Sequence, residues 1–96
     1  MIIKVRGYLT YRDVIGRHKI EQPDDIPVTL FDFIRGLAAE VPGEQGQLLF
    51  DDETGTIGQS VAIMLNGLHY NHLPDRLRTA LKDQDEIAVF PPAAGG

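Results

Sequence analysis

Hydrophobic and polar residues alternate along the first positions of the chain. Ile3 and Val5 fall on one face of an extended segment. Lys4 and Arg6 fall on the other. A period of two residues is typical of a strand with one buried face, so residues 1–9 are predicted to form a strand in the middle of a sheet.

A second strand is predicted close behind the first. Thr10 is expected to cap a helical turn over residues 11–15, which Gly16 ends in the left-handed conformation. This turn reverses the chain into residues 18–21, which are expected to pair antiparallel with the first strand. The connector that follows, residues 22–27, is rich in Pro and Asp and is expected to be exposed.

The hydrophobic period changes to 3.6 residues after Thr29. Thr29 is expected to be an N-cap, with Asp32 in the capping-box position, and the helix is expected to end at Val41, before Pro42. This apolar stripe is interpreted as the largest block of the core rather than as a cofactor contact. Its members are Leu30, Phe33, Ile34, Leu37, Ala38 and Val41.

The strands and helical segments predicted in the second half of the chain are shorter. Residues 43–59 are expected to be long and irregular. A buried strand over 60–65 and a type I′ turn at Asn66-Gly67 follow, and the turn leads into a short strand. A short helical segment is expected from 73 onward, with Leu77, Ala80 and Leu81 on one face. The last strand is predicted over 86–90.

This order of elements favours an α+β fold of the β-grasp, or ubiquitin-like, kind. In such a fold a mixed sheet packs on one main helix, and the other face of the sheet is available to a partner. Residues 1–91 are predicted to form this domain, and residues 92–96 are predicted to form a flexible C-terminal Gly-Gly tail.

Composition narrows the possible functions. A chain of 96 residues indicates one small domain, without room for a separate catalytic domain. A net charge of −5 and scattered Lys and Arg residues argue against nucleic-acid binding. We expect the apolar sheet face to carry an acidic rim that attracts a basic partner. With no cysteine, no signal-like segment and no membrane-length apolar run, the sequence favours a soluble cytoplasmic protein without redox chemistry.

Two groups of residues are candidate metal ligands, and neither is assigned a metal. The acidic turn at 51–55 lacks the oxygen-rich spacing of a calcium loop. His69 and His72 lack a third ligand. A solvated loop and two surface histidines are the preferred interpretations.

The end of the chain has the properties of a reactive tail. Pro91 and Pro92 have no N–H group, so a strand that ends at Phe90 cannot continue through them. The small residues of 93–96 can pass through a narrow channel in another protein. At ~3.3 Å per residue, the segment from Pro92 to the C-terminus spans roughly 16 Å. The group delivered is the α-carboxylate of Gly96; the alternative is an inert, frayed terminus.

Three segments resemble the MoaD/ThiS family of ubiquitin-like sulfur carrier proteins, most closely the small subunit of molybdopterin synthase. They are residues 2–6, residues 12–16 and, above all, the final segment 83–96 with its Phe-Pro-Pro-Ala-Ala-Gly-Gly ending. The chain departs from compact members by extra residues at 22–27 and 74–79, and by Gly7-Tyr8 where bulky aromatic residues are common.

The resemblance implies a carrier rather than an enzyme, with no bound cofactor. An E1-like adenylating enzyme of the MoeB/ThiF type would use ATP to activate Gly96, and sulfur would replace the AMP to give a thiocarboxylate. The large subunit of molybdopterin synthase (MoaE type) would then supply the catalytic groups for building the dithiolene that binds molybdenum or tungsten. By position, the residues that enter the partner's channel would be Gly95, Ala94, Ala93 and Pro92. The docking surface would be Phe90 and Pro91.

Three alternatives remain open from the sequence. The activated terminus could pass sulfur to another acceptor, such as a thiazole or transfer RNA. It could instead form an isopeptide bond with a lysine, as a protein modifier does. The domain could also be an interaction module with an inert tail.

Overall fold

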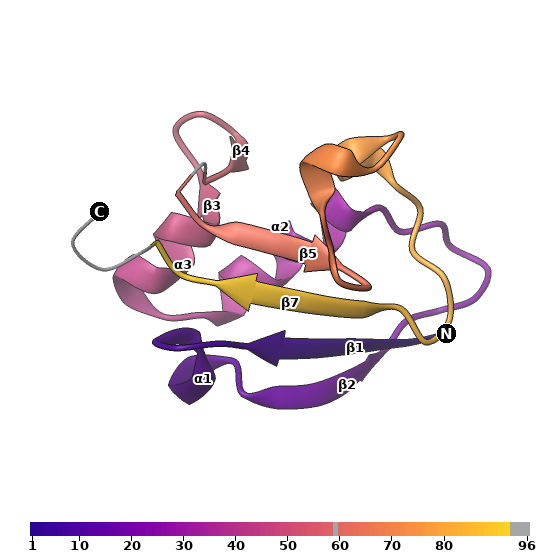
Figure 1. Ribbon diagram of the computed structural model, residues 1–96, viewed down its shortest axis with the longest axis horizontal. Helices are drawn as coiled ribbons and strands as arrows, with labels where there is room; N and C mark the ends of the chain where they lie inside the picture. The colour runs from indigo at the N-terminus through magenta and orange to yellow at the C-terminus, as the bar shows by residue number, and fades with distance from the viewer. Residues whose placement is uncertain (59, 93–96) are drawn as a thin grey trace.

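A five-stranded mixed sheet runs through the molecule in the order β2-β1-β7-β5-β6. The computed structural model describes residues 1–58 and 60–92. Figure 1 shows β1 and β7 side by side in the middle of the sheet, with their C-terminal ends at the same edge. The strands are β1 (Ile2–Gly7), β2 (Arg17–Glu21), β5 (Ala62–Leu65), β6 (Leu68–His69) and β7 (Glu86–Phe90).

The predicted N-terminal hairpin is confirmed, but its turn is closed differently. β1 pairs antiparallel with β2 and parallel with β7. Gly16 has a φ of 66°, as predicted for the end of the short helix α1 (Tyr11–Val14). The predicted cap at Thr10 is wrong, because its side chain makes no capping hydrogen bond. Backbone groups close the turn instead: the N–H of Gly7 donates to the carbonyl oxygen of Gly16 at 2.7 Å.

The main helix α2 (Leu30–Glu40) covers one face of the sheet, as predicted. The N–H of Asp32 donates to Thr29 Oγ1 at 3.1 Å, which confirms the N-cap. The whole predicted apolar stripe is buried, together with the inward residues of β1, β5 and β7. This is the β-grasp arrangement that the sequence predicts, with the helix on the inner face and the other face of the sheet directed outward.

The prediction of an irregular stretch over 43–59 is wrong for its described residues, 43–58. They form α3 (Gly43–Leu49) and a small hairpin of β3 (Phe50–Asp51) and β4 (Thr56–Ile57). Gly46 accounts for part of the difference, because a Cβ there would lie 2.2 Å from the carbonyl oxygen of Val41. Glycine is a poor helix former, so close packing of α3 against the end of α2 overrides local propensity.

The segment after β6 also differs from the prediction. It forms two separate 3₁₀ turns, Tyr70–His72 and Arg76–Arg78, rather than one short helix. Leu73 is extended, with a ψ of 144°, as expected for a residue that precedes a proline. Ala80 is exposed and bridges Thr29, so the predicted common apolar face is not formed.

The Asn66-Gly67 turn is confirmed and has an additional role. Both residues have positive φ, 52° and 86°, as a type I′ turn requires. Asn66 Nδ2 donates to Asp85 Oδ1 and Asn66 Oδ1 accepts from the N–H of Glu86, both at 2.9 Å. The turn between β5 and β6 therefore also holds the start of β7. Among the described residues, no helix has the length and apolar character needed to cross a membrane.

Asp83 ties the start of β1 to the segment before β7. The N–H of Ile2 donates to Asp83 Oδ1 at 2.7 Å, and this hydrogen bond lowers the pKa of Asp83 below its ordinary value of 3.8. A carboxyl group whose pKa is depressed by folding contributes stability above its unfolded pKa and loses that contribution as pH falls through its folded pKa. Unfolding midpoints measured below pH 3.8 are therefore expected to fall less steeply with acid in Asp83→Asn than in the unmodified protein. Identical acid profiles would contradict this role.

Candidate functional site

The C-terminal segment leaves the fold from a central strand. β7 lies between β1 and β5, with Gly7 beside Val89 and Ala62 beside Phe90. One further hydrogen bond, from the N–H of Tyr8 to the carbonyl oxygen of Val89 at 2.9 Å, extends the pairing to the end of the strand. We call Phe90, Pro91 and Pro92 the tail exit; all three are half-buried.

An aromatic pair lies at the tail exit. The rings of Tyr8 and Phe90 stack at a centroid distance of 4.4 Å and an interplanar angle of 11°. The guanidinium carbon of Arg6 lies 4.9 Å from the centroid of the Tyr8 ring, on the geometry of a cation–π contact. Phe90 was predicted as a docking residue, but Tyr8 and Arg6 were not. Tyr8 could have been identified from the predicted fold. The first and last strands of a β-grasp sheet pair with each other, and this pairing places Tyr8 next to Phe90.

Leu9 adds an exposed apolar side chain at the same edge of the sheet. Its side chain is 64% exposed, and its φ is 56°, in the left-handed region that residues with a Cβ rarely adopt. An exposed leucine held in a strained conformation beside the tail exit is a candidate contact for a partner.

The outer face of the sheet, away from α2, is apolar on one side and basic on the other. Residues that lie opposite one another across antiparallel strands point to the same face. One row crosses all the strands in the order Arg17, Arg6, Ala88, Met64 and His69. The face therefore changes from cationic on β2 and β1 to apolar on β7 and β5.

The charge of this face differs from what the sequence suggested. Four of the nine Lys and Arg residues, which we call the basic quartet, lie together on it: Lys4, Arg6, Arg17 and Lys19. The prediction of scattered basic residues is wrong on this side of the sheet, although two acidic residues, Glu21 and Glu86, share the same face. The hairpin register is the reason, because it places residues opposite one another that are far apart in the sequence.

The predicted reactive residues are only partly within the described structure. Pro91, Pro92 and Phe90 are described above. Ala93, Ala94, Gly95 and Gly96 lie outside the described residues, so their roles in threading and activation stay predictions. The described part shows where the tail starts and which surface surrounds it.

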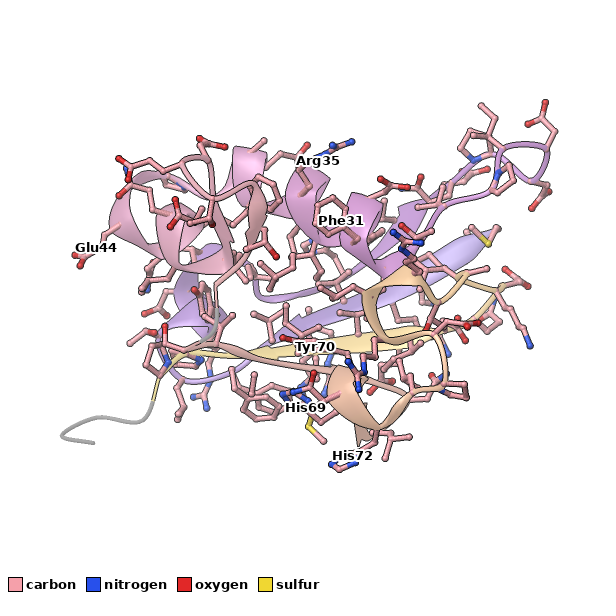
Figure 2. The ribbon with its side chains drawn as sticks, turned by 90° about the horizontal axis from the view of Figure 1, so that it is seen from above. Phe31, Arg35, Glu44, His69, Tyr70 and His72 are labelled. Carbon is pink, nitrogen blue, oxygen red and sulfur yellow. The ribbon has the colours of Figure 1, made fainter. Side chains whose placement is uncertain are left out.

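The histidines and the acidic turn offer no assembled metal site. Figure 2 shows His69 and His72 on the opposite side of the sheet from Phe31 and Arg35 of α2. The ring centroids of His69 and His72 are 6.4 Å apart, and His69 Nδ1 accepts a hydrogen bond from the N–H of Asn71 at 3.1 Å. Over residues 1–58 and 60–92, no group of three or more His, Cys, Asp or Glu side chains is placed to hold a metal ion.

The β-grasp sheet and a central last strand that ends in a Pro-Pro exit define a ubiquitin-like carrier or modifier. The model of the ThiS family matches residues 8–96, and the chain belongs to this family. It is 38% identical over 96 residues to small archaeal modifier protein 3 of Haloferax volcanii, and the match covers all of both chains.

Solved structures agree with this assignment. A Haloferax volcanii protein solved in solution is 37% identical, with a TM-score of 0.74 over 100% of this chain and 87% of that chain. Small archaeal modifier protein 1 of Methanosarcina acetivorans is 27% identical, with a TM-score of 0.76 over 99% of this chain and 96% of that chain. The predicted ubiquitin-like β-grasp fold and the resemblance to the MoaD/ThiS family are confirmed. The chain is a member of a family of ubiquitin-like sulfur carriers and modifiers.

Proposed function

We propose that this protein is a sulfur carrier whose C-terminal Gly96 is activated by a separate adenylating enzyme. The observation that carries the proposal is the tail exit: a central strand ends at Phe90, and Pro91 and Pro92 direct the chain away beside a stacked aromatic pair. The family match extends to residue 96, so it includes the Gly-Gly end. A fold of this kind presents a terminus to another protein's active site.

The chemistry requires no catalytic group from this chain. A carboxylate oxygen of Gly96 attacks the α-phosphorus of ATP on an enzyme of the MoeB/ThiF type, and pyrophosphate leaves. The resulting acyl adenylate is an electrophile. A sulfur nucleophile then attacks its carbonyl carbon, the bond between this carbon and the AMP oxygen breaks, and a thiocarboxylate remains. The part of this chain is to bind the enzyme and to position the terminal carbonyl.

The acceptor that we propose first is a pterin precursor bound to a molybdopterin synthase large subunit of the MoaE type. There the terminal sulfur would be transferred to build the dithiolene of a molybdenum or tungsten cofactor. The support is the Phe-Pro-Pro-Ala-Ala-Gly-Gly ending together with membership of the ThiS family.

A second function is conjugation of Gly96 to lysine amines of other proteins. The observation that favours it is the 38% identity, over the full length of both chains, to a protein named as a small archaeal modifier. Both functions share the adenylation step and differ only in the nucleophile that attacks afterwards. Mass-shifted conjugates in extracts of the source cells, absent when Gly96 is deleted, would favour the modifier.

Intact-mass spectrometry tests the shared chemistry. The purified full chain is incubated with its adenylating enzyme, ATP and a sulfide source. The expected result is a mass increase that corresponds to one oxygen replaced by sulfur, located on the C-terminal peptide. No change, with an enzyme shown to be active on its own carrier, would contradict sulfur carriage.

Replacing Phe90 by alanine is expected to weaken binding to the adenylating enzyme. Aromatic residues at the centre of an interface commonly contribute ~2 kcal/mol or more, so the KM for this protein should rise at least about tenfold with kcat little changed. Phe31→Ala is the matched control, because Phe31 is also half-buried and also pairs with a ring, that of Phe50 at 5.7 Å, but lies on the helix side of the sheet. Equal KM values for the two variants would show that the tail exit is not a docking surface.

A further inference from the structure

The basic quartet places like charges directly opposite one another. Lys4 lies opposite Lys19, and Arg6 lies opposite Arg17, across the antiparallel pair β1 and β2. Like charges in such positions repel and destabilise a sheet. The free protein therefore retains a local repulsion that an oppositely charged partner would relieve.

Little within the described part of the chain neutralises this charge. Its two ion pairs join the N-terminal amine to Asp24 and Arg35 to Asp32, and neither involves the quartet. Glu86 is the carboxylate in register with Lys4 across the parallel pair of β1 and β7. Glu21 lies on the same face at the end of β2, opposite Ile2. Two carboxylates beside four cations still leave the surface of β1 and β2 positive in a chain whose net charge is −5.

The same surface is hollowed and continuous with the tail exit. A groove of about 430 Å³ is lined by the quartet together with Glu86, Val5 and His18. Arg6 joins it to the tail exit, because its guanidinium lies over the Tyr8 ring and that ring stacks on Phe90. A protein that contacts the tail exit would thus meet the positive surface as well.

We infer that the outer surface of β1 and β2 is an electrostatic docking surface for a carboxylate-rich surface of the protein that receives Gly96. This inference rests on the proposed function, in which the adenylating enzyme is the first such protein. Complementary charge at the edge of an interface accelerates association and selects the partner. The apolar part of the same face, on β7 and β5, supplies the area that becomes buried. The basic quartet thus selects an acidic partner although the chain as a whole is acidic.

An acidic protein fits this surface better than a nucleic acid does. Nucleic-acid affinity depends on extended tracks of Lys and Arg that neutralise many phosphates. Here the positive surface is confined to four side chains, and the 14 Asp and Glu residues of the chain repel a long polyanion. A folded partner can place carboxylates opposite the quartet alone.

The double variant Arg17→Glu/Lys19→Glu tests the inference without weakening the fold. Each new carboxylate lies opposite a remaining cation, Lys4 or Arg6, so repulsive pairs become attractive and the melting temperature should be unchanged or higher. We expect kcat/KM for adenylation to fall about 10- to 100-fold at low ionic strength, with the deficit shrinking as salt is added.

The matched control is Arg76→Glu/Arg78→Glu, which changes the net charge equally at two exposed positions of the 3₁₀ turn Arg76–Arg78, outside β1 and β2. It is expected to retain kcat/KM within about twofold. Salt screens the interaction between exposed charges that are separated by more than a Debye length, so charges away from the interface contribute little to binding. Normal adenylation of the first variant, or equal losses in both, would overturn the inference while leaving Gly96 activation intact. Failure of the unmodified protein to be adenylated would instead count against the proposed function.

A second measurement does not depend on that enzyme. The isotopically labelled full chain is titrated, in separate NMR experiments, with a short polyglutamate peptide and with an oligothymidylate of equal charge. Polyglutamate is expected to shift the amide signals of β1 and β2, and the Arg17→Glu/Lys19→Glu variant should lose these shifts. Absent shifts on these strands, or tighter binding of the oligothymidylate, would overturn the inference, and the latter result would assign the surface to nucleic acid.

Discussion

Removal of Gly96 is expected to abolish acyl adenylate formation, lowering the rate by at least ~10³-fold, without unfolding the domain. The shortened chain still ends in a carboxylate, that of Gly95, but this group lies ~3.3 Å short of the reacting position. Misplacement of a reacting group by about 1 Å already costs on the order of 10²-fold in rate. Pyrophosphate exchange with the adenylating enzyme measures the loss directly.

A companion deletion separates reach from recognition of the Gly-Gly end. Deleting Ala93 shortens the tail equally and keeps Gly95 and Gly96 as the last two residues. If reach decides, both deletions lose adenylation to the same extent. Thermal unfolding is expected to be unchanged in both, because both deletions leave every strand and core residue of the described structure in place. Full adenylation of the chain that lacks Gly96 would refute the assignment of its carboxylate as the activated group.

Ile87→Ala is expected to lower the free energy of unfolding by about 2–5 kcal/mol. Ile87 is 0% exposed and lies in β7 between Val5 of β1 and Leu65 of β5, so truncation leaves a cavity where three strands meet the helix. A domain of this size has a total stability of roughly 5–15 kcal/mol, of which the loss is a large part. Because β7 ends at the tail exit, this strand links core packing to the position of the tail.

Chemical denaturation of Ile87→Ala and of a matched variant, Ile26→Ala, measures this contribution. Ile26 is 56% exposed, so the same truncation there is expected to change stability by less than ~0.5 kcal/mol. The midpoint should shift at constant slope in Ile87→Ala. Equal losses in the two variants would contradict the central place of Ile87 in the core.

Elements with strong local signals were predicted well. β1, α2, the Asn66-Gly67 turn and β7 are all found where their periods and turn residues indicated. α3 was missed because its stability comes from packing against α2. Its sequence contains two glycines, so the local helix propensity does not indicate a helix there. Of the candidate site, Phe90, Pro91 and Pro92 were identified from chain chemistry alone, whereas the stacking of Tyr8 on Phe90 was not.

The sequence by itself determined the order of the five strands of the main sheet and of the main helix, and the chemistry of the tail exit. These features depend on hydrophobic period, on proline and on glycine, which act over a few neighbouring residues. Only the tertiary structure decided which charges share the outer face of the sheet. The hairpin register brings Lys4 opposite Lys19 and Arg6 opposite Arg17, and parallel pairing brings Tyr8 beside Phe90. Pairing between distant segments is fixed by the packing of the whole core. The composition therefore shows that the protein is acidic, but it does not show that basic side chains gather on one surface.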